Sequence, residues 1–175
     1  MIKCIFWTAA LLVASVGYSV DLGGVKGFEP DRYLGTWYQV QSTDPFFQRG
    51  CKCTKAQYSA GESNKIDVLN TCYLPNGSTR EAMGTAKISN PDMPSQLTVK
   101  FSRFTPDFVN YIVTEVGPNY EYSVVVSPGN SPIWILSREK TLDPSIIAGI
   151  RVRLVQAGVR VGSLKDFNTN DCPGL

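Results

Sequence analysis

The sequence predicts an all-β domain: an eight-stranded antiparallel up-and-down β-barrel with one C-terminal α-helix packed outside it. Three observations predict this fold. Turn residues interrupt the chain about every 8–12 positions, apolar and polar residues alternate between the interruptions, and one late segment has helical spacing instead. The chain has 175 residues, of which 43% are hydrophobic and 18% charged. This length and composition are typical of one globular domain with a sizeable core.

The N-terminus has the pattern of a signal peptide. A short basic start precedes an apolar run over 4–16, and small residues recur from Ser15 to Ser19. The apolar run is too short for a comfortable membrane span. We therefore expect a signal peptide over 1–19, followed by a single domain over 20–175. The protein is then secreted, into the extracellular space or, in a bacterium, into the periplasm.

Eight segments between turn residues have the composition of strands. They cover 36–43, 53–60, 65–73, 80–89, 96–103, 110–116, 120–127 and 133–137. Every second residue of a strand shares a face, so alternation places Asn70, Phe101 and Tyr122 on inward faces with their apolar neighbours. The segment from 80 alternates poorly and predicts no face.

One helix is predicted late in the chain. Asp143 is a suitable N-cap, Pro144 suits the first helical position, and Gly158 is a typical C-terminal stop. At helical spacing, the apolar residues fall on one face and two arginines point outward. The apolar residues are Ile146, Ile147, Ile150, Leu154 and Val155, and the arginines are Arg151 and Arg153. We expect this helix to cover the outer wall of the sheet.

Composition excludes several classes of function. The chain has no histidine, which excludes serine–histidine and cysteine–histidine nucleophiles and histidine-ligated zinc. The formal net charge is +2 without a basic run, which favours no nucleic-acid partner. We therefore expect that the protein is not an enzyme and needs no cofactor.

The cysteines predict two disulfides. One of the five lies in the predicted signal peptide, and the remaining four, Cys51, Cys53, Cys72 and Cys172, allow three pairings. A single residue separates Cys51 from Cys53, whereas metal-binding pairs usually have a longer spacer, so we expect no metal site. Asn76-Gly77-Ser78 is a candidate glycosylation site at Asn76.

The stretch Gly35-Thr36-Trp37 begins the first predicted strand. A closed eight-stranded barrel encloses a space for one small ligand, and one of its ends must be sealed against water. We expect Trp37 to plug that end. Arg138, which follows the last predicted strand, is placed to lie across the indole ring. Gly35 allows the tight turn into the strand.

Several stretches together resemble the lipocalin family, and in particular its apolipoprotein D and bacterial lipocalin branch. They are DRYLGTWYQVQSTDPFFQRG, CKCTKAQY, KIDVLN, LTVKFSRF, GPNYEYSVVVSP, PIWILSREKTLDP and DCPGL. The resemblance extends from about Phe28 to the C-terminus. The family's three signature regions fall on Gly35–Trp37, on Gly117–Tyr120, where this sequence departs from the usual Thr-Asp-Tyr, and on Arg138.

The resemblance implies a carrier whose ligand pocket is lined by Tyr58, Asn70, Phe101 and Trp134. Alternation adds Leu136 and Tyr122 to this set. The resemblance also implies the pairing Cys53–Cys172, which leaves Cys51–Cys72. The extra Cys51 keeps the alternative pairing Cys53–Cys72 with Cys51–Cys172 open.

Three functions are compatible with this sequence. The first is a secreted carrier of a small hydrophobic ligand such as a fatty acid, sterol or retinoid, bound in the barrel. The second is a pigment protein that binds a bilin or carotenoid. The third is an interaction module, because Phe46 and Phe47 in the first long loop form a potential apolar contact for a membrane or a receptor.

Overall fold

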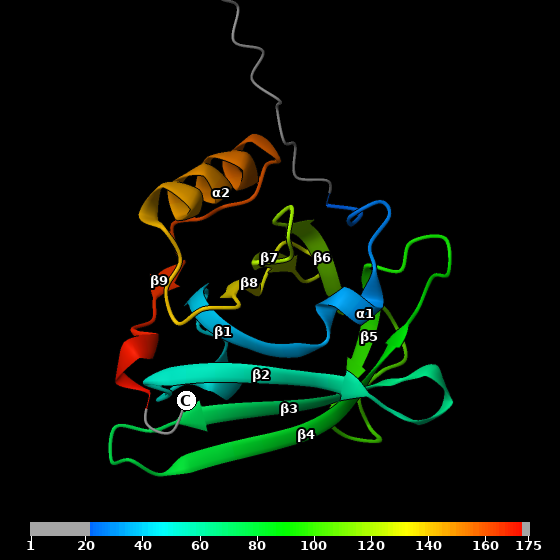
Figure 1. Cartoon of the computed structure of the whole chain (residues 1–175), viewed down its shortest axis with the longest axis horizontal. Helices are drawn as coiled ribbons and strands as arrows, with labels where there is room; N and C mark the ends of the chain where they lie inside the picture. Colours follow the sequence, from blue (N-terminus) through cyan, green and yellow to red (C-terminus); the bar gives the residue numbers. More distant parts are fainter. Residues whose placement is uncertain (1–21, 173–175) are drawn as a thin grey trace, which may run out of the picture.

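The computed structural model describes residues 22–172, so the predicted signal peptide over 1–19 lies outside the described residues. Its single sheet contains β1 (Gly35–Ser42), β2 (Cys53–Ala60), β3 (Ile66–Tyr73), β4 (Thr79–Ile88), β5 (Gln96–Lys100), β6 (Tyr111–Val116), β7 (Tyr122–Val126), β8 (Ile133–Ser137) and β9 (Lys165–Asp166). Neighbouring strands pair antiparallel in chain order from β2 to β8, and β1 pairs with both β8 and β2. The first eight strands therefore close into a barrel (Figure 1).

The eight predicted strands are confirmed, with boundaries that shift by three residues at most. Turn chemistry located them well, since the breaks coincide with residues such as Gly77 and Gly129, which adopt positive φ angles of 84° and 83°. The two-residue strand β9 was not predicted. It pairs with the end of β1, outside the barrel.

The two ends of the barrel differ. The loops 43–52, 74–78, 101–110 and 127–132 all lie at the end where β1 finishes, and we call this end the mouth. The opposite, closed end holds the short helix α1 (Pro30–Tyr33), which lies directly before β1 in Figure 1.

Apolar side chains form two main clusters, one inside the barrel and one outside it. The inner cluster contains Phe28, Tyr33, Trp37, Tyr58, Ile66, Val68, Ala86, Leu97, Val99, Val113, Tyr120, Val125 and Leu136. The outer cluster contains Val40, Tyr122, Val124, Val126, Ile133, Ile135, Ile150, Leu154, Val159 and Leu164. Strands β7 and β8 contribute alternate residues to the two clusters, so both of their faces are buried.

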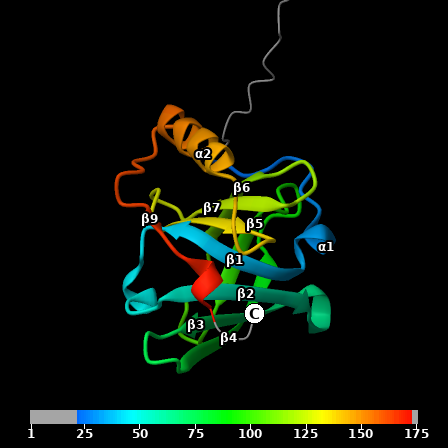
Figure 2. The same ribbon diagram turned by 60° about the vertical axis from the view of Figure 1, so that its left-hand side comes forward.

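Helix α2 (Pro144–Gln156) covers the outer cluster (Figures 1 and 2). Its predicted cap is confirmed, because the Asp143 carboxylate accepts a hydrogen bond from the Ser145 backbone N–H at 2.7 Å. Ile150 and Leu154 are fully buried. Three details of the expected helix face are wrong. Val155 is 55% exposed. Arg153 and Arg151 turn back to the barrel, where Arg153 bonds to Glu115 and Arg151 donates to Gln41 of β1 at 3.2 Å.

The C-terminal segment after α2 runs down the outside of β1 and β2 (Figure 2). Cys172 at its end is bonded to Cys53, and both pack against Tyr73 in a small separate cluster. The second disulfide joins Cys51 to Cys72 at the mouth. Among the residues that the structure describes, no helix is long and apolar enough to cross a membrane.

Candidate functional site

Trp37 lies at the closed end of the barrel and is fully buried. Its indole N–H donates to the Tyr33 carbonyl at 2.8 Å. The guanidinium carbon of Arg138 lies 3.7 Å from the centroid of the indole ring, which is a cation–π contact. Gly35 at φ +96° brings the chain close beneath this arginine, since a Cβ at this position would lie 3.2 Å from Nη1 of Arg138.

Arg138 also connects three segments of backbone. Its guanidinium donates to the carbonyls of Thr36 at 2.9 Å, Arg32 at 2.7 Å and Tyr120 at 3.3 Å. Burial lowers the pKa of Arg138 from its ordinary value. The arrangement closes this end of the barrel, so a ligand that enters the barrel does so through the mouth.

Strand register shows which of the proposed ligand-binding residues face the interior. Directly paired residues share a face of the sheet. Tyr58 pairs with Val68, and Leu136 pairs with Ser123, whose hydroxyl contacts Tyr33 in the inner cluster. Leu136 is buried near the floor of the barrel. Asn70 and Trp134 lie higher, toward the mouth.

Asn70 has a small residue on each side. Its direct cross-strand partners are Ala56 on β2 and Ala82 on β4. Although all three residues face inward, Asn70 and Ala56 are only half-buried and Ala82 is exposed. Among the described residues, the Asn70 amide has no hydrogen-bond partner. A polar group in such a position is available to a ligand.

Trp134 forms the opposite wall of the upper interior. Its ring stacks on Tyr111, with the centroids 6.3 Å apart and the planes at 24°. Its indole N–H donates to the side-chain oxygen of Gln48 at 3.1 Å. Gln48 belongs to the first loop of the mouth, so this hydrogen bond ties the loop to the wall of the barrel.

Below Trp134, four hydroxyl groups form a chain across the interior. The Tyr58 hydroxyl lies 3.1 Å from that of Tyr111, which lies 2.8 Å from that of Tyr33, and Tyr33 lies 3.0 Å from the Ser123 hydroxyl. Burial raises the pKa of Tyr58 to about 12 and also raises the pKa values of Tyr33 and Tyr111 well above their ordinary value. All three phenols are therefore neutral at physiological pH.

Phe101 directly follows β5, at the start of a mouth loop. Strand β5 ends at Lys100, and the Phe101 side chain is 44% exposed. Its ring packs against Gly84, where a Cβ would lie 2.7 Å from Cδ1 of Phe101. Glycine at 84 thus allows a close approach of ring and backbone.

The assignment of Tyr122 to the pocket is wrong. Tyr122 belongs to the outer cluster beneath α2, and its hydroxyl donates to Glu115 at 2.8 Å. Glu115 also accepts from Arg153 of α2 at 3.0 Å and 2.5 Å. Alternation identified the two faces of β7 correctly. The more apolar face, however, lies under the helix, and the face with Ser123 and Val125 turns inward.

Five exposed phenylalanines belong to two of the loops at the mouth. Phe46 and Phe47 come from the first loop, and Phe104 and Phe108 follow Phe101 in the loop between β5 and β6. Phe46 and Phe104 are 78% and 79% exposed. The guanidinium of Arg103 lies over the Phe104 ring at 4.8 Å. The expected exposure of the Phe46–Phe47 loop is thus present in the structure, and the 101–110 loop exposes further rings.

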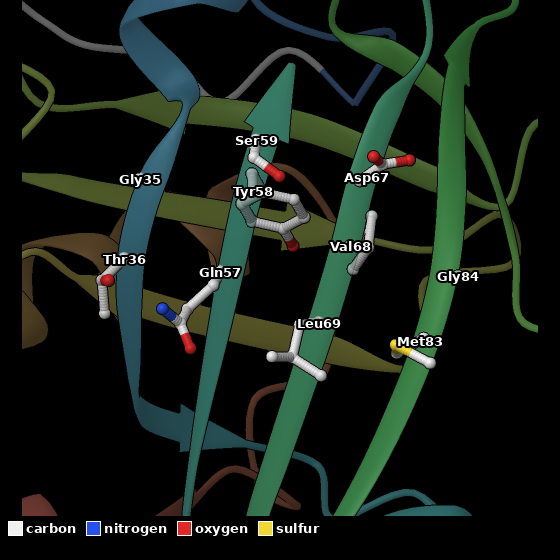
Figure 3. Close-up of a pocket in the computed structure, with 10 residues that line it drawn as sticks. All are labelled: Gly35, Thr36, Gln57, Tyr58, Ser59, Asp67, Val68, Leu69, Met83 and Gly84. Carbon is white, nitrogen blue, oxygen red and sulfur yellow. The ribbon is translucent and has the colours of Figure 1, made fainter. Parts of the chain in front are cut away.

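A groove of about 430 Å³ lies across β1 to β4 near the closed end (Figure 3). Its side chains include a row of direct cross-strand partners, Thr36, Gln57, Leu69 and Met83. This row is on the outer face, opposite to Tyr58. The lining also includes Tyr58, Val68 and Gly84 of the inward-facing row, and it contains neither Asn70 nor Trp134.

Asn76 lies in the exposed turn between β3 and β4. Its side-chain oxygen accepts hydrogen bonds from the backbone N–H and the hydroxyl of Ser78, at 3.1 Å and 2.8 Å. Glycosylation at this position stays a prediction.

The chain is similar to known proteins over most of its length. A family model described as a lipocalin-like domain matches residues 28–169. The chain is 34% identical over 141 residues to the outer membrane lipoprotein Blc of Vibrio cholerae, covering 79% of this chain and 81% of that protein. It is 28% identical over 179 residues to mouse apolipoprotein D, covering 94% and 93%.

A solved structure has the same fold. Insecticyanin from the tobacco hornworm Manduca sexta matches with a TM-score of 0.65 and 20% identity, covering 86% of each chain. Lipocalins are generally binding or carrier proteins for small hydrophobic molecules. The matched family model, the relatives and the closed barrel with its external helix agree: the chain belongs to the lipocalin family.

Proposed function

We propose that this protein is a secreted or envelope-located carrier that binds one small lipophilic molecule in the mouth-side half of its barrel. One observation carries the proposal. The inward-facing Tyr58, Val68 and Ala86 are buried, whereas Asn70 on β3 is half-buried and Ala82 on β4 is exposed. An accessible interior lined by small and aromatic side chains favours apolar cargo.

The named residues have distinct roles in this proposal. Trp134 and Tyr111 provide a flat aromatic wall, and Asn70 orients a polar group of the ligand. Phe101 lies at the entrance, while Leu136 and Tyr58 lie near the floor. The proposed location follows from the predicted signal peptide and from the relatives, one of which is named as an outer membrane lipoprotein.

The test is a fluorescence titration of ligand-stripped protein with retinol, sterols and fatty acids. Binding beside Trp134 changes the indole emission saturably, and Trp134→Phe removes most of the change. Ala82→Phe fills the space beside Asn70 and is expected to abolish binding. The matched control is Met83→Phe, which adds a ring to the outer face of the same strand. Unchanged affinity in Ala82→Phe would place the ligand elsewhere, and emission unaffected by the whole panel would refute the carrier function.

The pigment alternative divides into two cases. Covalent attachment of a bilin needs a free thiol, and all four cysteines of the described region are in disulfides. A non-covalent carotenoid or bilin would occupy the same interior as a lipid. Visible absorbance of protein purified from its source distinguishes pigment from colourless cargo.

A second function is supported by the exposed phenylalanines at the mouth. We propose that they contact a lipid membrane, from which cargo would enter the barrel directly. Aromatic rings at loop tips suit the interface of a bilayer. Arg49 and Arg103 lie in the same two loops, and no ion pair of either is found among the described residues. Their positive charges complement anionic lipid headgroups.

Vesicle co-sedimentation tests this contact. The double variant Phe46→Ser/Phe104→Ser is expected to lose binding to vesicles that contain phosphatidylserine. The control is Met83→Ser, which removes an equally exposed apolar side chain, 80% accessible, from the barrel wall. Equal sedimentation of both variants and the parent would contradict a role for the mouth, and capture of a protein partner instead would favour a receptor.

A further inference from the structure

We infer that the barrel selects ligands with a neutral hydroxyl or carbonyl group over ligands with an ionised carboxylate. This inference rests on the proposed carrier function and names its ligand class. It is carried by the chain of hydroxyls from Tyr58 through Tyr111 and Tyr33 to Ser123, and by the charges that are missing around that chain.

The hydroxyl chain has one hydrogen-bonding group left over for a ligand. Four hydroxyls carry four protons, and the three hydrogen bonds between them use three. When every hydrogen bond points from Ser123 toward Tyr58, the spare proton is on the Tyr58 hydroxyl, which then donates to a ligand. When the direction reverses, Tyr58 instead offers a lone pair. Tyr58 has a single hydrogen-bond partner, Tyr111, among the described residues.

A group that is either a donor or an acceptor matches alcohols, ketones and aldehydes equally. It matches a carboxylate poorly, because a carboxylate accepts several hydrogen bonds and needs a compensating charge when it is removed from water. The raised pKa values of the three tyrosines follow from the same environment, which disfavours negative charge.

Positive charges lie only at the two ends of the barrel interior. Among the residues that the structure describes, the inward-facing strand positions carry one cation, Arg80, the direct partner of Cys72 at the mouth. Arg80 is exposed, and its guanidinium donates to the Arg49 carbonyl at 2.9 Å. Arg138 lies across the Trp37 ring, and its charge acts on Tyr33 in the direction that lowers the pKa. Its guanidinium is bonded to three backbone carbonyls, so a carboxylate at the Tyr58 end of the chain would have neither arginine as a direct partner.

The experiment compares retinol with retinoic acid, which share a hydrocarbon skeleton and differ in the terminal group. At neutral pH, ligand-stripped protein is expected to bind retinol at least about tenfold more tightly, as read from quenching of Trp134. Tyr58→Phe removes the hydroxyl at the ligand end of the chain, and we expect it to reduce the preference to within about threefold. Tyr73→Phe is the control, because Tyr73 is buried outside the barrel beside the Cys53–Cys172 disulfide.

A second measurement separates ligand charge from protein stability. Lowering the pH below about 5 neutralises a carboxylic acid, so retinoic acid is expected to gain affinity while retinol does not. Equal or tighter binding of retinoic acid at neutral pH would refute the inference. If Arg80→Gln then abolished that binding, the carboxylate would be at the mouth. Absence of binding by either retinoid and by the rest of the panel would instead refute the carrier function itself.

Discussion

Replacing Arg138 tests how the closed end of the barrel is held together. In Arg138→Met, the side chain keeps its approximate length but loses its charge and its donors. The two short hydrogen bonds, to the carbonyls of Arg32 and Thr36, are each worth about 1.5–3 kcal/mol because the donor is charged. The contact with Trp37 adds about 0.5–1 kcal/mol.

Partial exposure of the guanidinium reduces the total, since water replaces some of the lost contacts. We expect a net loss of about 2–4 kcal/mol in the free energy of unfolding. For a domain of this size, such a loss lowers the melting temperature by roughly 5–15 °C. Arg138→Lys keeps the charge over the ring but lacks the planar fork that reaches three carbonyls, so it is expected to lose about half as much.

Thermal and urea unfolding measure both variants, with the exposed Arg160→Met as the control. The double variant Trp37→Leu/Arg138→Met completes a mutant cycle and isolates the coupling between the two side chains. The reasoning is refuted if Arg138→Met melts within about 2 °C of the Arg160 control, or if the two substitutions at the closed end are strictly additive.

Three further predictions concern the remaining structural features. Glu115→Gln leaves Arg153 without its carboxylate partner, and we expect it to lower the free energy of unfolding by about 2–3 kcal/mol, as measured with urea. An unchanged urea midpoint would mean that α2 is held by apolar packing alone. Removing the Cys53–Cys172 disulfide, which spans 119 residues, should lower the free energy of unfolding by about 1–1.5 kcal/mol more than removing Cys51–Cys72, which spans 21. Variants with each cysteine pair replaced by alanine measure the difference. The free energy of unfolding should be constant up to pH ~10 and fall as the pH rises toward 12, because the pKa of Tyr58 is raised to about 12 in the folded state. Tyr58→Phe should make this fall shallower. Identical dependence of stability on alkaline pH in the two proteins would contradict the raised pKa of Tyr58.

The strands and the helix were predictable because their signals are local. Glycine and proline mark the turns, alternation marks the strands, and a cap residue before a proline marks the start of α2. The plug was predictable for a similar reason, since Trp37 and Arg138 occupy recognisable positions at the beginning and end of the strand series.

Alternation alone could not predict which side chains of a strand face the barrel interior. A period of two separates the residues of β7 into two sets but does not say which set is inside. The expectation that the more apolar set faces inward fails where a helix covers the outer wall, and Tyr122 is the result. A register shift in β6 between Val113 and Glu115 adds to this, because it turns Glu115 outward to meet Arg153.

The hydroxyl chain was beyond prediction for a different reason. Its members come from α1, β2, β6 and β7, and the hydrogen bonds join residues 53, 78 and 90 positions apart. No single strand shows an unusual pattern there, and Ser123 alone would be taken as a solvent-facing residue. Only closure of the barrel brings the four groups together.

The same closure explains why polar groups persist inside an otherwise apolar barrel. Each hydroxyl of the chain is hydrogen-bonded to a neighbour, so burying each of them costs less than burying an unpaired hydroxyl. Asn70 has no such neighbour, and the alanines beside it leave the space that a ligand or water would need. Two polar features of the interior therefore differ: the chain of hydroxyls leaves one spare donor or acceptor at Tyr58, whereas the whole Asn70 amide depends on what enters from the mouth. This difference makes Asn70→Leu a probe of ligand preference, whereas Tyr111→Phe, which breaks the chain at its centre, would also alter stability.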